Sequence, residues 1–153
     1  MAILRYALML LFLINTSALA CEQNLNFSPN KGIEIEAYTK EQTLLYKIVT
    51  SENINSHKIK FDTDKKISIA IKDFNFDDHL DMSISHLDDG MGVFTVSRVF
   101  IYSPAKKDFY EIFPNCGEQF LNLRIDADNR KLISSYFNNN IPTTCETYTE
   151  KIE

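Results

Sequence analysis

The sequence has no cluster of basic residues, and its charge balance is acidic. It contains 16 lysine and arginine residues against 21 aspartate and glutamate residues, which gives a formal net charge of −5 at pH 7. Proteins that bind nucleic acids depend on grouped lysine and arginine side chains to neutralise phosphates. The composition therefore argues against a nucleic-acid-binding function.

The sequence also lacks a linker, a low-complexity segment and a clear internal repeat. Turn signals instead separate short segments rich in β-branched and aromatic residues, at a spacing of roughly 8–12 residues that is typical of all-β sandwiches, barrels and propeller-like sheets. We therefore expect a single all-β domain over residues 21–153. Its expected form is an antiparallel meander, propeller-like or sandwich-like.

The apolar run near the start of the chain is too short to span a lipid bilayer. It covers residues 6–14, follows the single basic residue Arg5, and precedes the small-x-small sequence at residues 18–20. This order is typical of a secretory signal with its cleavage site, whereas a membrane-spanning helix needs about 20 apolar residues. We predict a signal peptide at residues 1–20, export to the periplasm and no transmembrane span.

Cysteine is scarce, with residues only at positions 21, 116 and 145. An exported chain meets an oxidising compartment, where disulfides persist. A bond between Cys116 and Cys145 would close a segment of roughly 30 residues and contribute about 3–4 kcal/mol through chain entropy. Cys21 would then be left over, although a bond from Cys21 to either of the others remains open at this stage.

Cys21 would be the first residue after cleavage, the position at which bacterial lipoproteins carry a lipid. Such signals usually have leucine three residues before the cysteine, and here that residue is Ala18. Ordinary cleavage and lipid anchoring to the outer membrane both remain open.

Alternating apolar and polar residues locate the strands. Residues 33–37 alternate with period two, and residues 44–49 follow across a polar turn, which favours a hairpin. The alternative is a helix that begins at Thr39 with Gln42 as its capping partner. Residues 51–66 are polar enough to form a long loop or an edge strand. Further strands are expected at residues 67–71, 82–86, 93–103, 109–113, 120–125, 131–137 and 145–149, with a loop at 138–142.

Residues 73–81 place oxygen-bearing side chains at alternate positions. Asp73, Asn75, Asp77 and Asp81 occupy positions 1, 3, 5 and 9 of this loop, and the main-chain carbonyl of His79 occupies position 7. Ca²⁺ takes roughly six to eight oxygen ligands, which a tight loop supplies when every second residue turns inward. The intervening apolar residues would pin the loop to a core. The spacing predicts a Ca²⁺ site.

The loop is not an EF-hand, and it has an alternative without metal. An EF-hand requires glutamate at position 12, where this chain has Ile84. Position 6 is usually glycine, because the backbone turns there with a positive φ, and this chain has Asp78. Aspartate tolerates that conformation with some strain. The alternative is an Asp/Asn-rich turn in which the side chains cap the backbone.

Residues 69–81 resemble the strand-loop-strand calcium motif of integrin-type FG-GAP repeats. More narrowly, the chain is similar to a family of small exported Gram-negative proteins in which this motif precedes a glycine-containing turn, an aromatic strand and a late hairpin. The matching segments here are residues 89–94, 98–102, and 121–126 with 132–135. The resemblance implies a periplasmic immunity protein that inhibits a lysozyme-like toxin, with the metal supporting the binding surface.

We expect binding, not catalysis. Ser83, Ser85 and Ser97 lie on predicted strands without the tight turn that exposes a nucleophile, and His86 is expected to be a packed or rim histidine. The expected partner is a toxin or lysozyme-like hydrolase. The alternatives are a structural or accessory envelope lipoprotein anchored through Cys21, and a hydrolase that uses the acidic loop. Residues 88–92 form an acidic turn, expected to be an ordinary solvated turn in preference to a binding rim.

Overall fold

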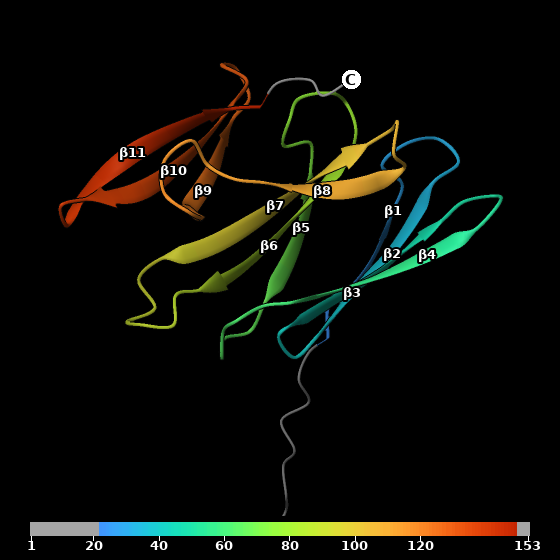
Figure 1. Ribbon diagram of the computed structural model, residues 1–153, viewed down its shortest axis with the longest axis horizontal. Helices are drawn as coiled ribbons and strands as arrows, with labels where there is room; N and C mark the ends of the chain where they lie inside the picture. Colours follow the sequence, from blue (N-terminus) through green and yellow to red (C-terminus); the bar gives the residue numbers. More distant parts are fainter. Residues whose placement is uncertain (1–21, 150–153) are drawn as a thin grey trace, which may run out of the picture.

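The computed structural model describes residues 22–149, so the predicted signal peptide at 1–20 and the lipidation candidate Cys21 lie outside the described residues. Eleven β-strands arranged in two antiparallel sheets make up the described chain, which confirms the all-β prediction (Figure 1). Residues 22–149 contain no helix with the length and hydrophobicity needed to cross a membrane.

The first sheet is a four-stranded meander. It consists of β1 (Asn24–Phe27), β2 (Glu34–Lys40), β3 (Thr43–Val49) and β4 (Ile54–Lys60), in that spatial order. The hairpin predicted for residues 33–49 is confirmed as β2 and β3, and the alternative helix from Thr39 is wrong. The residues form a strand and not a helix because apolar and polar side chains alternate along β2, so that one face of the strand is buried and the other exposed. The polar segment 51–66 contains the edge strand β4, whereas β1 was not predicted.

The second sheet has seven strands and curls into a half-barrel. Its spatial order is β11-β10-β9-β7-β6-β5, and β8 also pairs with β7. The strands are β5 (Ser68–Lys72), β6 (Asp81–Leu87), β7 (Thr95–Ser103), β8 (Asp108–Ile112), β9 (Phe120–Asp126), β10 (Lys131–Asn138) and β11 (Ile141–Tyr148).

The sheet forks along one edge of β7. Val96 and Ser97 pair with β9, whereas residues 99–103 pair with β8. Strands β8 and β9 thus pair with successive parts of the same edge of β7, and they separate beside Arg98. On its other edge β7 pairs continuously with β6.

Two hydrophobic clusters cover opposite faces of the central strands. Met82 and Phe100 belong to the first cluster, which also contains Ile35, Leu44 and Ile48 of the first sheet. Val99 points to the other face and belongs to the second cluster. The second cluster consists of Phe74, Val99, Ile101, Phe120 and Leu132. Strands β6 and β7 thus lie between the first sheet and the curled strands β9 and β10 (Figure 1).

The predicted loop at residues 138–142 is wrong. Strand β10 runs to Asn138, a two-residue turn follows, and β11 begins at Ile141. Asn139 and Asn140 have φ values of 49° and 64°, and asparagine tolerates this left-handed region well enough to form a tight hairpin. Pro142 lies within β11, which is an edge strand and so does not need its missing N–H.

The predicted disulfide is confirmed. Cys116, in the loop between β8 and β9, is bonded to Cys145 of β11, with Cα atoms 5.9 Å apart. Asn115 reinforces the junction, because its main-chain N–H donates to Thr147 Oγ1 and its side chain donates to the carbonyl of Glu146. The loop between β8 and β9 is therefore fixed to β11, the last strand.

The start of the described chain is fixed to both sheets. The side-chain amide of Gln23 pairs with the main chain of Ile69 on the edge of β5, donating to its carbonyl at 2.9 Å and accepting from its N–H at 2.8 Å. The main-chain carbonyl of Gln23 accepts a hydrogen bond from Thr39 of β2. A single glutamine therefore bridges the two sheets.

Candidate metal centre

The predicted calcium loop connects β5 to β6, which are paired directly at its base through Lys72 and Asp81. Phe74 is buried in the second hydrophobic cluster and attaches the loop to the core, as expected. Phe76 is half-buried and Leu80 is 38% exposed, so the apolar attachment rests mainly on Phe74.

Asp73 organises the turn. Its Oδ1 accepts hydrogen bonds from the main-chain N–H groups of Phe76 and Asp77, and its Oδ2 accepts one from Asp78 at 2.9 Å. Asp78 has a φ of 69°, the left-handed conformation that position 6 of such a loop requires. Phe76 also has a positive φ of 63°, which the spacing of oxygen ligands did not predict.

Asn75 carries an unusual buried atom. The residue is 2% exposed, and its Nδ2 donates to Asp77 Oδ2 at 2.8 Å, but its Oδ1 has no hydrogen-bond partner. Leaving a buried acceptor unpaired costs about 1–3 kcal/mol. An amide oxygen of this kind is a normal ligand for a hard cation.

Asp81 connects the end of the loop to its start and to β7. It is fully buried, and its Oδ2 accepts from Phe74 N–H at 2.7 Å while its Oδ1 accepts from Tyr102 N–H at 2.9 Å. Burial raises the pKa of Asp81 to about 7 against the opposing effect of these two hydrogen bonds, and the negative charges of Asp77 and Asp73 raise it further. The loop therefore concentrates carboxylate charge that a cation would offset.

Groups from distant parts of the chain also hold the loop. The His79 ring lies 3.2 Å from the carbonyl of Pro29, Nδ1 to O, and packs edge-on against Tyr102. On the other side, Arg130 donates to the carbonyl of Phe76, and Thr149 Oγ1 donates to the carbonyl of Phe74. Sequence reasoning did not find Arg130 and Thr149, because their proximity to the loop depends on the curl of the second sheet.

The donor set matches a hard cation more closely than a transition metal. In the described part of the chain, no three histidine, cysteine, aspartate or glutamate side chains converge as a metal-binding group. That finding covers Asp73, Asp77 and Asp81, three of the predicted ligands, whose carboxylates accept main-chain hydrogen bonds. The predicted set also contains the Asn75 amide oxygen and the His79 carbonyl, so all of its donor atoms are oxygens. Asp73, Asn75 and Asp77 lie in the loop between β5 and β6, Asp81 is the first residue of β6, and calcium binding there stays a prediction.

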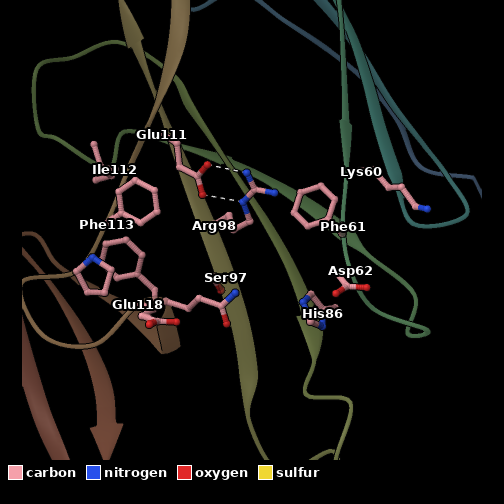
Figure 2. Close-up of a pocket in the computed structure, with 13 residues that line it drawn as sticks. Lys60, Phe61, Asp62, His86, Ser97, Arg98, Glu111, Ile112, Phe113 and Glu118 are labelled. Carbon is pink, nitrogen blue, oxygen red and sulfur yellow. Dashed lines mark hydrogen bonds and ion pairs between the residues drawn. The ribbon is translucent and has the colours of Figure 1, made fainter.

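A hollow of about 460 Å³ lies at the fork of β7, between β8, the β8–β9 loop and the end of β4 (Figure 2). Arg98 spans part of it and donates to both carboxylate oxygens of Glu111 at 2.6 Å. The guanidinium also lies over the rings of Phe61 and Phe100, 4.8 and 5.3 Å from their centroids. His86 lies at the margin of the hollow and is half-buried, in keeping with the rim position expected for it.

Exposed apolar residues gather where the β6–β7 loop meets the β10–β11 hairpin. The rings of Phe94 and Phe137 are in edge-to-face contact, with centroids 5.2 Å apart, so the two segments adjoin. We call this surface the loop patch. It consists of the exposed Met91, Val93 and Phe137 together with the half-buried Phe94, and Met91 is 91% exposed.

The acidic turn beside the loop patch has a structural role. Asp88 accepts hydrogen bonds from the main-chain N–H groups of Phe94 and Gly92, and these bonds hold its pKa below the ordinary range. Asp89 accepts from Thr63 Oγ1 at 2.5 Å. The side chains cap the turn in the manner expected of an ordinary aspartate-rich turn.

Comparison of the chain with protein-family models, with curated proteins and with solved structures gave no match. The resemblance to calcium-loop immunity proteins therefore stays a prediction from residues 69–81 and the segments that follow them.

Proposed function

We propose that this protein is an exported, calcium-stabilised binding protein that inhibits a cell-wall-degrading enzyme or toxin in the periplasm. The calcium assignment depends above all on the unpartnered Oδ1 of the buried Asn75. In a metal-free loop this atom is an uncompensated acceptor, whereas in a loaded loop it is a ligand. Asp73, Asp77, Asp81 and the His79 carbonyl supply the remaining oxygens.

The existing hydrogen bonds of the carboxylates are compatible with this assignment. A carboxylate offers about four lone-pair sites over two oxygens, so main-chain donors to Asp73 and Asp81 leave acceptor capacity free. These donors also fix each carboxylate in place before any cation arrives, which reduces the ordering cost of binding.

The binding role is supported by the loop patch and by the family resemblance. Contiguous exposed apolar surface with a polar rim is typical of protein interaction sites. Met91 and Val93 are 91% and 60% exposed, and Phe137 is 42% exposed on the neighbouring hairpin. The acidic net charge of −5 would favour encounter with a basic hydrolase.

A second candidate is a structural or accessory envelope lipoprotein anchored through Cys21. The disulfide favours it, because Cys116 and Cys145 are bonded to each other and leave Cys21 without a cysteine partner in the chain. Mass spectrometry of the N-terminus from native membranes decides this point. A diacylated Cys21 supports the anchor, and an unmodified Cys21 removes it.

Thermal unfolding tests the calcium site. The chain from Glu22 to Glu153 contains all the strands and both hydrophobic clusters that the structure describes. Its unfolding is compared in EDTA, Ca²⁺ and Mg²⁺. At a Ca²⁺ concentration of about 100 times the dissociation constant, the stability should rise by about 2.7 kcal/mol. Asp77→Ala should abolish this rise, whereas Glu52→Ala, in the exposed β3–β4 turn, should retain it. A wild-type protein that unfolds identically in all three conditions contradicts the site.

Inhibition is measured with the calcium-loaded protein against a panel of lysozyme-type muramidases, amidases and transglycosylases acting on purified peptidoglycan. We expect one class of hydrolase to be inhibited, and Met91→Asp with Val93→Asp to relieve the inhibition without changing the melting temperature, since both side chains are exposed. If the protein itself hydrolysed peptidoglycan and Asp77→Ala abolished this activity, the proposed function would be wrong and the protein would be a hydrolase.

A further inference from the structure

The hollow at the fork follows directly from the topology. Because β8 and β9 share one edge of β7 and separate beside Arg98, no strand fills the space between them. The buried side chains of Ser97 and Phe120 form its floor, and the β8–β9 loop and the end of β4 form its walls. The disulfide and Asn115 hold that loop in place, so the hollow is a fixed feature of the fold.

The charges around the hollow do not cancel. Arg98 is committed to Glu111 through two hydrogen bonds, so this pair is neutral overall. Figure 2 shows the amine of Lys60 directed away from the hollow, and Asp62 and Glu118 on opposite sides of it. Both carboxylates are exposed, and neither forms an ion pair within residues 22–149. With Lys60 included, the lining residues carry a net formal charge of −1, and the two carboxylates without an ion pair lie on opposite sides of the space.

An aromatic wall accompanies these charges. Phe113 lines the hollow and is 63% exposed, and an exposed aromatic ring can stack against a flat cation. The protein already uses this geometry once at the same place, because the Arg98 guanidinium lies over Phe61 and Phe100.

We propose that this hollow binds an arginine side chain of a protein partner, with the guanidinium between Asp62 and Glu118 and against Phe113. Guanidinium is planar, stacks on aromatic rings, is weakly hydrated and presents five donors, whereas ammonium is a compact and strongly hydrated charge. A volume of about 460 Å³ exceeds the needs of one side chain and leaves room for the adjoining main chain. The carboxylates lie on opposite walls, which suits a ligand that spans them better than a single metal ion.

This inference adds a recognition element to the proposed function and depends on that function only for the identity of the partner. The site itself requires neither calcium nor a hydrolase. Failure of the inhibition assay and failure of the arginine site are therefore separate results.

The test uses the peptide acetyl-Gly-Arg-Gly-amide and its citrulline analogue, which has nearly the same shape but no charge. Each is titrated into ¹⁵N-labelled protein from Glu22 to Glu153 and followed by NMR. We expect the arginine peptide to shift the amides of Ser97, Phe113 and Glu118, and the citrulline peptide to bind at least tenfold more weakly. Raising the salt concentration from 0.05 to 0.5 M should weaken the arginine complex, because the pairing charges are exposed.

Variants separate the site from general attraction to an acidic surface. Asp62→Asn and Glu118→Gln should each lower the affinity several-fold, and the double variant should abolish saturable binding. Glu52→Gln removes one negative charge far from the hollow and should leave the affinity unchanged. Equal binding of the two peptides, shifts located away from the hollow, or an unaltered affinity of the double variant would each overturn the proposal. The same spectra verify that every variant is folded.

Discussion

At the scale of single residues, the predicted calcium loop departs from relaxed backbone geometry at Phe76 and at Asp78, which occupies the position usually taken by glycine. Its φ of 69° lies in the left-handed region, where a side chain with a Cβ meets steric resistance and glycine does not. Its neighbour Asp73 nevertheless holds the turn by accepting the N–H of Asp78. The strain at position 6 is thus offset by a carboxylate at position 1.

Asp78→Gly should therefore stabilise the protein, by up to about 1 kcal/mol, in EDTA as well as in Ca²⁺. Urea unfolding at both conditions measures the change. Asp128→Gly is the matched control, since Asp128 is exposed and does not have a positive φ, and glycine there should destabilise the protein through the entropy of the unfolded chain. A loss of stability in Asp78→Gly would contradict the strain argument.

Asp88 gives a pH dependence with a defined sign. Hydrogen bonds from Phe94 and Gly92 hold its pKa below the ordinary value, so the unfolded chain binds a proton at a higher pH than the native protein does. Stability from this group is present above the unfolded pKa of about 4 and is lost as the pH falls through the native value. Urea unfolding between pH 6 and 2.5 should show a shallower acid loss in Asp88→Asn than in the wild type. Glu52→Gln serves as the control, and equal slopes for wild type and Asp88→Asn would count against the role of Asp88.

At the scale of elements, the sequence predicts what depends on neighbouring residues and misses what depends on distant pairing. Alternation in β2, β3 and β5 and the oxygen spacing of residues 73–81 are local signals, and each strand formed as expected. The fork of β7 carries no local signal, because it arises when two separate strands compete for one edge. Arg130 and the hollow were not predicted for the same reason. Strand β1 was not predicted because it has only four residues, too few for a clear alternating pattern.

The disulfide is the element-scale feature with the clearest energetic consequence. Cys116 and Cys145 are 29 residues apart in sequence, and opening that loop should cost about 3–4 kcal/mol. We expect Cys116→Ser with Cys145→Ser to lower the free energy of unfolding by this amount, measured in urea. Dithiothreitol should reproduce the loss in the wild type and have no further effect on the double variant. An unchanged stability after reduction would mean that Asn115 alone fixes the loop.

At the scale of the whole molecule, the two hydrophobic clusters are not independent. Both include side chains from β7, with Phe100 and Tyr102 facing the first sheet and Val99 and Ile101 facing the second cluster. A strand shared by two cores cannot lose one of them and keep its own structure. We therefore expect the two sheets to unfold as one cooperative unit.

Leu132→Ala and Ile48→Ala test this cooperativity by weakening one hydrophobic cluster each. Each removes a fully buried side chain, one from each cluster, and should cost about 2–5 kcal/mol. In both variants a single urea transition should be seen, coincident in far-UV circular dichroism and in tyrosine fluorescence, which is the available probe because the chain has no tryptophan. Two separated transitions in either variant would divide the molecule into two folding units.

The bridging glutamine at the start of the described chain, Gln23, would limit the rotation of the domain relative to any group attached at Cys21. Gln23 is bound to both sheets through its side chain and its carbonyl, and only Glu22 separates it from Cys21. Two extended residues reach roughly 7 Å. A lipid or a partner cysteine attached at Cys21 would thus be tethered to the domain by a segment shorter than twice the spacing between paired strands. The domain would then rest against its attachment point with the β5 edge towards it, and its orientation would be set by that contact and not by diffusion on a flexible stalk.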